Sequence, residues 1–195
     1  PSQRLIVNLA PADRPKEGSH FDLPIALSVL AELGVVPRDA VEENLAFGEL
    51  GVNGSITPAP GALPAAVAAQ AAGLSLICPE ACGPEAAWAG GELPIIAPAS
   101  LIQLINHFRG TQVLSRPAPG ELVEAGQIPD LNQVKGQESA KRALEIAAAG
   151  HHNLPMVGPP GSGKSMMAER LPGLLPPLSA AELLDVSMIH SVAGL

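Results

Sequence analysis

The sequence predicts an α/β protein in two parts, and three observations lead to that prediction. Short apolar segments alternate with segments of helical period over the first 110 residues. Hydrophobic residues make up 47% of the 195 residues and aromatic residues only 2%, so the cores must consist of Ala, Leu, Ile and Val. A glycine-rich loop near residue 160 lies between a strand-like and a helix-like segment. We therefore expect an α+β front domain followed by an α/β nucleotide-binding unit.

The front domain is expected to span residues 1–110. Helical spacing, caps and closing glycines predict its helices, which we place at 22–33, 61–72, 84–89 and 100–108. Apolar runs predict its strands, which we place at 4–10, 45–50, 74–78 and 93–96. Asn53-Gly54 is a strong tight-turn signal and leads into a strand at 55–57, so a hairpin is expected there.

A linker and the start of a second domain are expected after residue 110. Residues 111–129 are rich in Pro and Gly and have no clear period, which indicates an interdomain linker. Residues 130–195 should form the start of the second domain, with a helix at 136–149 and a last helix near 180–190. Ser179 and Glu182 form a capping-box pattern at the start of that last helix.

The strongest motif is the run GPPGSGKS at residues 158–165, which fits the phosphate-binding (Walker A) pattern G-x-x-x-x-G-K-[ST]. Its glycines allow backbone amides to turn towards phosphate oxygens. Lys164 would lie against the β- and γ-phosphates, and the Ser165 hydroxyl would bind Mg²⁺. The predicted nucleotide-binding residues are Gly158, Pro159, Pro160, Gly161, Ser162, Gly163, Lys164 and Ser165.

The flanks of the motif favour this interpretation over a chance surface turn. Residues 153–157 are expected to form a buried strand and residues 166–171 a helix, although Pro155 is unusual in a central strand. Val134 and Gly136 are candidates for positions near the adenine, with simple packing as an equal alternative. The expected ligands are ATP or ADP with Mg²⁺.

Charge and composition limit the other functions. The net charge of −8 gives no general attraction to nucleic acid or to a membrane, and we expect a cytoplasmic protein without a membrane span. Cys78 and Cys82 lack the further ligands of a structural zinc site and are expected to be ordinary reduced thiols. The chain starts at Pro1 with a strand-like run close behind, so we expect it to be a fragment.

Several runs resemble the magnesium-chelatase-like AAA+ ATPases of the ComM/YifB type. In the second part these are residues 130–137, the helix around 141–145, and His152-Asn153 followed by the phosphate loop. In the front part they are residues 7–13, 15–18, 21–27 and 48–50, which point to this type rather than to AAA+ proteins in general. The resemblance covers nearly the whole chain.

The front part also resembles, more distantly, the proteolytic domain of Lon proteases. Residues 15–18 (PKEG) are similar to the segment before the Lon nucleophile, but His20 takes the serine position and Ser19 lies one place early. Leu63 takes the position of the Lon lysine, and residues 50–99 contain neither Lys nor Arg. Because a serine–lysine dyad needs an amine as base, we expect a Lon-like fold without peptidase activity.

The resemblance implies a ring-forming, hexameric ATPase. ComM-type proteins are DNA helicases that promote branch migration in natural transformation. The alternative is a motor like magnesium-chelatase subunit I, which drives metal insertion, or a regulatory ATPase with a non-enzymatic front domain.

ATP hydrolysis by AAA+ proteins needs an apolar run ending in Asp-Glu (Walker B) and an arginine finger. After Ser165 the closest match is residues 183–186 (LLDV), which reads as an ordinary helix face. We therefore expect this chain to bind ATP or ADP weakly without turning ATP over.

Overall fold

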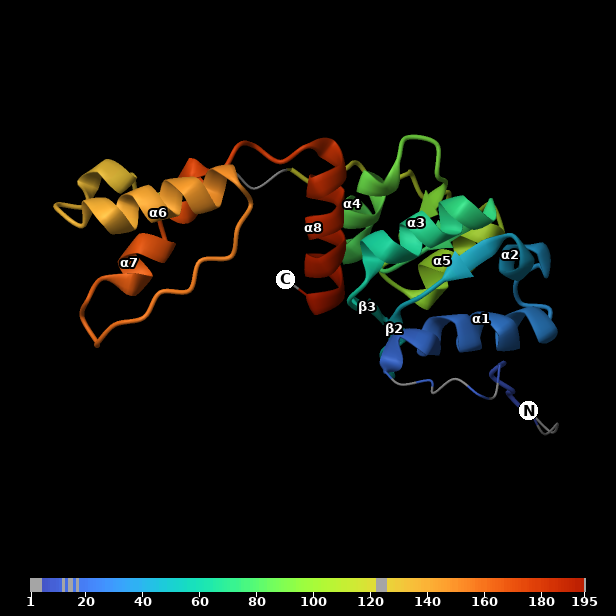
Figure 1. The fold of residues 1–195 in the computed structure, drawn as a ribbon. Helices are drawn as coiled ribbons and strands as arrows, with labels where there is room; N and C mark the ends of the chain where they lie inside the picture. The colour runs from blue at the N-terminus through green and yellow to red at the C-terminus, as the bar shows by residue number, and fades with distance from the viewer. Residues whose placement is uncertain (1–4, 12, 14–15, 17, 122–125, 195) are drawn as a thin grey trace. The chain divides into compact units, whose positions relative to one another are not determined.

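The computed structural model describes residues 5–11, 13, 16, 18–121 and 126–194. It divides into two compact units (Figure 1), the first comprising Pro1–Glu121 with Leu183–Leu195 and the second Leu122–Glu182. Each unit has its own buried residues.

A parallel sheet forms the centre of the first unit. Its strands β1 (Asn44–Ala46), β4 (Ser75–Ile77) and β5 (Ile95–Ile96) lie in the order β1-β4-β5. Leu76 of β4 pairs with Leu45 of β1 on one side and with Ile95 of β5 on the other. Parallel strands need crossover connections, which the intervening helices supply. The α/β class expected from the sequence is confirmed.

Helices cover both faces of this sheet, because neighbouring residues of a strand point to opposite faces. Leu76 belongs to a core with α3 (Ala62–Ala72) and α4 (Gly83–Ala86), whose packing residues are largely alanines. Ile77 belongs to a second core with α1 (Asp22–Glu32) and α5 (Leu101–Phe108). The buried alanines are thus found mainly on the face of the sheet that α3 and α4 cover.

The predicted hairpin is present, but the strand before it is divided. β2 (Glu49–Leu50) pairs antiparallel with β3 (Ile56–Thr57), and Asn53 Oδ1 accepts hydrogen bonds from the Ser55 amide and hydroxyl in the turn. Residues 45–46 belong instead to β1 of the parallel sheet. The positive φ of Gly48 (148°) lies between the two strands, where the chain changes direction.

Short helical turns complete the first unit. They are η1 (Ser19–Phe21), α2 (Asp39–Glu42), η2 (Glu80–Cys82) and η3 (Ala87–Ala89). The described part of the proline-rich segment after α5 packs onto this unit as far as Glu121. Arg116 donates to the carbonyls of Leu93 and Gly90, and Trp88 Nε1 donates to the Gly120 carbonyl over 3.0 Å.

One predicted strand of the first unit is wrong. Residues 5–9 are exposed and have no strand pairing, and residue 4 lies outside the described residues. Alternating apolar residues are not sufficient for a strand, which also needs a neighbour for its backbone hydrogen bonds. Of the Lon-like segment 15–18, only residues 16 and 18 are described.

The second unit consists of η4 (Leu131–Gln133), α6 (Glu138–Ala149), α7 (Lys164–Ala168), η5 (Leu171–Leu174) and the start of α8 (Ala180–Ala193). Its core contains Leu131, Val134, Leu144 and Met167. A long extended segment joins α6 to α7 (Figure 1). This unit brings residues 130–134 and the helix after the glycine-rich loop into one cluster.

Helix α8 begins with the predicted capping box. The Ser179 amide and hydroxyl donate to Glu182 Oε2 over 2.8 and 2.7 Å, and the Glu182 amide donates to Ser179 Oγ over 3.3 Å. The last turns of the helix belong to the first unit, where Ser191 is buried and accepts hydrogen bonds from the amides of Gly61 and Leu63. Ser191 therefore caps the start of α3.

Candidate nucleotide site

The glycine-rich loop has the local geometry that a phosphate-binding loop requires. Gly161 and Gly163 have φ values of 78° and 87°, in the left-handed region that favours glycine. Helix α7 starts directly afterwards at Lys164. The two glycines thus turn the chain sharply before the helix, as the motif predicts.

The Lys164 side chain, at the end of the loop, makes hydrogen bonds to the backbone at the start of the loop. Its Nζ donates to the carbonyl oxygens of Gly158 and Pro159 over 2.7 and 2.8 Å, and to Ser162 Oγ over 3.2 Å. These are charge-assisted hydrogen bonds, which are stronger than neutral ones. They hold a cation within the loop, close to the backbone that would surround a phosphate.

The side chains of the other predicted residues are largely open to solvent. Pro159 and Pro160 are exposed, as is Ser162, whose hydroxyl contacts Lys164. Ser165 is exposed in the first turn of α7, one residue after the lysine. All eight predicted positions therefore lie on one continuous loop and helix start.

The strand predicted before the loop is wrong. Residues 152–159 have no regular secondary structure, and Val157 is 98% exposed. Among the described residues of this unit there is no strand with which they could pair. Pro155 also lacks the amide that a central strand must donate. The helix after the loop is present, although α7 ends at Ala168.

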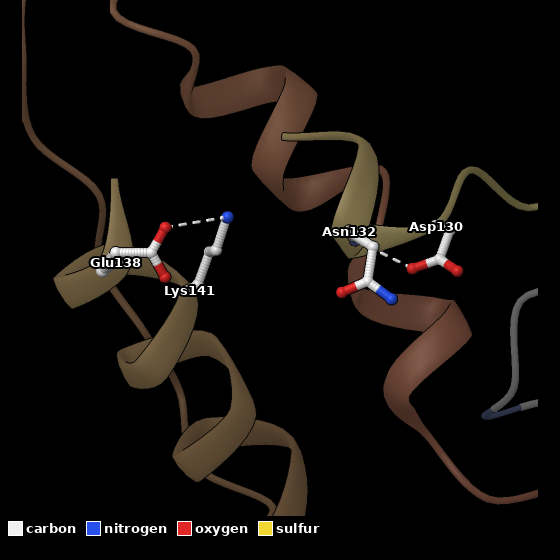
Figure 2. A network of polar contacts seen from close by, with 4 residues as sticks. All are labelled: Asp130, Asn132, Glu138 and Lys141. Carbon is white, nitrogen blue, oxygen red and sulfur yellow. Dashed lines mark hydrogen bonds and ion pairs between the residues drawn. The ribbon is translucent and has the colours of Figure 1, made fainter. Parts of the chain in front are cut away.

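Residues 130–134 are held against α7 and α6. Asp130 Oδ1 accepts the Asn132 amide over 2.8 Å and so caps η4 (Figure 2). Arg170 donates to the Asp130 carbonyl over 3.1 Å and to the Met166 carbonyl over 2.6 Å. Val134 is 2% exposed and packs in the core of this unit, while a position of Val134 and Gly136 near the adenine stays a prediction.

The first turns of α6 carry an ion pair between Glu138 and Lys141. Lys141 Nζ lies 3.1 Å from Glu138 Oε1, one turn earlier on the helix (Figure 2). The Lys141 side chain is 17% exposed and that of Glu138 is 80% exposed. Such a pair contributes little to stability.

Sequence reasoning missed the corner at Gly136 and Gln137. Both have positive φ values, 70° and 55°, immediately before α6. Gly-Gln has no strong turn signature, so no local pattern identifies a left-handed glutamine. The corner directly follows Leu131 and Val134, which are buried in the core of this unit.

The front unit buries Leu63, at the position expected for the Lon lysine, and separately its two cysteine thiols. Leu63 is 2% exposed in the first turn of α3, where Glu85 Oε1 accepts its amide over 3.2 Å. Burial raises the pKa of the Cys78 thiol to about 12, with smaller contributions from Cys82 and Glu85. Burial also raises the pKa of Cys82, whose Sγ contacts the Ala59 carbonyl. Both cysteines are free, as expected.

Residues 183–186 lie inside α8, so the helical interpretation of the LLDV run is confirmed. Within the described ranges, no group of three or more His, Cys, Asp or Glu side chains could hold a metal ion. Over the same ranges, every helix is too short or too polar to cross a membrane.

Two family models match the chain. One, described as magnesium chelatase, subunit ChlI, matches residues 130–195, and the other, described as subunit ChlI of Mg-chelatase, matches residues 1–81. The matches thus include both the glycine-rich loop and much of the front unit.

Individual relatives extend the match over the whole chain. The chain is 41% identical over 195 residues to the uncharacterized protein YifB of Escherichia coli K12, covering all of this chain and 38% of that protein. It is 37% identical over 199 residues to the competence protein ComM of Haemophilus influenzae, covering 98% of this chain and 38% of that protein. An archaeal Lon protease of Halobacterium salinarum is 41% identical over 66 residues, 33% of this chain and 9% of the protease.

The chain spans about two fifths of the length of the YifB and ComM relatives. The partial Lon match is consistent with the Lon-like relation expected from the sequence. Taken with the two subunit ChlI models, these similarities show that the chain belongs to the magnesium-chelatase-like AAA+ proteins of the ComM/YifB type.

Proposed function

We propose that residues 158–165 bind the polyphosphate of ATP or ADP. The observation that carries this proposal is the conformation of the loop, in which Lys164 Nζ at its end donates hydrogen bonds to the carbonyls of Gly158 and Pro159 at its start. Left-handed glycines and a following helix leave backbone amides available for phosphate oxygens. The Lys164 ammonium supplies the positive charge that a phosphate chain needs.

The donor set also suits Mg²⁺ bound together with a nucleotide. Mg²⁺ prefers oxygen ligands and keeps several waters, so it is usually held by one or two protein groups and substrate phosphates. The exposed Ser165 hydroxyl provides one such oxygen next to Lys164. When bound, the ion neutralises phosphate charge, and this chain would contribute the serine ligand.

Fluorescence titration with mant-ADP and Mg²⁺ tests nucleotide binding. We expect saturable binding to the wild-type chain and at least a tenfold loss of affinity in Lys164→Ala, because one charge-assisted contact to phosphate is removed. Arg142→Ala is the matched control, since among the described residues Arg142 pairs only with Glu145, on the exposed face of α6. Equal binding by wild type and Lys164→Ala would contradict the proposal.

We further propose that this chain by itself does not turn over ATP. Residues 183–186, the nearest match to the carboxylate segment that hydrolysis needs, are helical and lack Glu after Asp185. A phosphate-release assay should therefore give no rate above background. Release that disappears in Lys164→Ala would show this expectation to be wrong.

For the whole protein we propose a cytoplasmic, hexameric ATPase that moves DNA branches in recombination. The support is the similarity to the competence protein ComM over 98% of this chain. The net charge of −8 gives the chain no general attraction to DNA, so contacts to DNA would come from elsewhere in the ring.

Metal insertion of the magnesium-chelatase type is the second candidate. It is favoured by the two subunit ChlI models, which match residues 1–81 and 130–195. The full-length protein should be tested with ATP on a synthetic Holliday junction. ATP-dependent branch migration supports the first function, and its absence together with ATP-dependent Mg²⁺ insertion into protoporphyrin supports the second.

A further inference from the structure

The corner before α6 holds a glutamine in an unusual backbone conformation. Gln137 has a φ of 55° and ψ of 39°, the left-handed region that side chains other than Asn and Asp rarely adopt. It takes the N-cap position of α6 without any side-chain capping hydrogen bond. Local capping therefore does not explain the conformation.

The surrounding packing fixes this corner next to the loop. Leu131 and Val134 are buried in one cluster with Met167 of α7. On the other side, the amides of Ala140 and Lys141 both donate to the Gln137 carbonyl over 3.0 Å. The backbone of Gln137 is thus held between the core and the first turn of α6.

The Gln137 side chain lies against the glycine that precedes Lys164. A side-chain carbon placed on Gly163 would lie 3.3 Å from Gln137 Nε2. Gly163 is the left-handed residue from which α7 starts. The carboxamide is therefore at the loop itself, on the side where the chain enters the helix.

The Gln137 carboxamide has hydrogen-bond donors that the described residues do not use. Gln137 is exposed, and its side chain makes no hydrogen bond to the described part of the chain. A glutamine amide carries two donors and one acceptor. Strained backbone of this kind is typically maintained at ligand sites, where it presents a side chain in a required direction.

We propose that Gln137 contacts the nucleotide, with Nε2 donating a hydrogen bond to a phosphate oxygen of a nucleoside polyphosphate held by residues 158–165. The inference rests on the proposed nucleotide binding and adds a residue that the loop motif does not contain. Gln137 would supply a neutral donor beside the positive charge of Lys164.

The test compares four variants in mant-ADP titrations with Mg²⁺, and repeats them with inorganic tripolyphosphate as competitor. We expect Gln137→Ala to weaken both ligands three- to tenfold and Gln137→Glu to weaken them more than tenfold, because a carboxylate repels phosphate. Gln133→Ala is the matched control, since Gln133 is exposed in η4, and it should bind like wild type.

Gln137→Gly separates a ligand contact from a structural role. Glycine adopts the left-handed region without strain, so this variant should melt at a higher temperature than wild type without ligand, yet bind mant-ADP as weakly as Gln137→Ala. A structural role would instead lower affinity and melting temperature together, or leave affinity unchanged in Gln137→Gly.

The outcomes distinguish this inference from the proposed function. If Gln137→Ala and Gln137→Glu bind like wild type while Lys164→Ala loses binding, the role of Gln137 is wrong and nucleotide binding stands. If Gln137→Ala weakens mant-ADP but not tripolyphosphate, the phosphate contact is wrong. If the wild-type chain binds neither ligand, both proposals fail.

Discussion

At the scale of single residues, Cys78 and Cys82 show how burial controls reactivity. Cys78 is 0% exposed and Cys82 is 5% exposed, and burial raises the pKa of both thiols. The thiolate is the reactive form. We expect neither cysteine of the folded chain to react with iodoacetamide at pH 7.5, and both to react in denaturant. Mass spectrometry of labelled peptides measures this, and rapid labelling of the native chain would contradict it.

The same shift predicts a loss of stability at alkaline pH. The pKa of Cys78 rises from 9.0 to about 12 on folding, so the folded state holds its proton where the unfolded state loses it. This stabilisation is complete below pH 9 and is lost as the pH rises towards 12. Between pH 9 and 10 the contribution of Cys78 to the free energy of unfolding should fall by about 1 kcal/mol. Urea unfolding at these two pH values measures the loss, and Cys78→Ala should show a smaller one.

At the scale of elements, helix α3 depends on the glycine that closes it. Gly73 has a φ of 69° at the C-cap, and apart from its two neighbours in the chain no described residue has an atom within 4 Å of where a Cβ would be. Gly73→Ala should therefore destabilise the first unit by about 1 kcal/mol through backbone strain alone. Gly91 has the same open surroundings with an ordinary φ, so Gly91→Ala should be neutral or slightly stabilising in urea unfolding. Equal effects of the two variants would contradict the strain argument.

The start of α8 should respond to pH through its capping box. The hydrogen bond from Ser179 lowers the pKa of Glu182 below its ordinary 4.5. The carboxylate therefore stabilises the folded state above pH 4.5, and this stabilisation is lost as the pH falls through the lowered pKa. Ser179→Ala should weaken protection of residues 180–183 from amide exchange at pH 7, and the difference from wild type should shrink at pH 3. A difference that stays constant with pH would show that Glu182 does not take part.

At the scale of the whole molecule, nucleotide binding should be visible in only part of the chain. Ligand that binds the folded state stabilises it by about 3 kcal/mol at a hundred times its Kd. We expect Mg²⁺ and ADP to slow amide exchange in residues 158–168, which contain the loop and α7, and in residues 130–137, whose buried members pack against α7. Residues 62–72 of α3, in the other unit, serve as the internal reference. Uniform protection of both regions would contradict a site confined to the second unit.

Local signals in the sequence predicted the helices well. Asp22 to Gly34, Gly61 to Gly73 and the Ser179 capping box mark helices that the structure places within one to three residues. The phosphate-loop pattern also predicted the left-handed Gly163 and the helix that follows it. Each of these features depends on residues within about five positions, so the sequence contains what is needed to infer it.

Strands were predicted less well, because a strand needs a partner that the local sequence does not specify. Residues 5–9 and 153–157 have apolar patterns like that of β4, yet of these segments only β4 has neighbours on both sides. Tertiary structure therefore determines which apolar segment enters the sheet and where Gln137 lies. The sequence by itself determined the helices, the glycine-rich loop and its lysine, since these rest on neighbouring residues. Packing of Leu131 and Val134 against α7 placed Gln137 beside that loop, because contacts distant in the chain form only once the core is assembled.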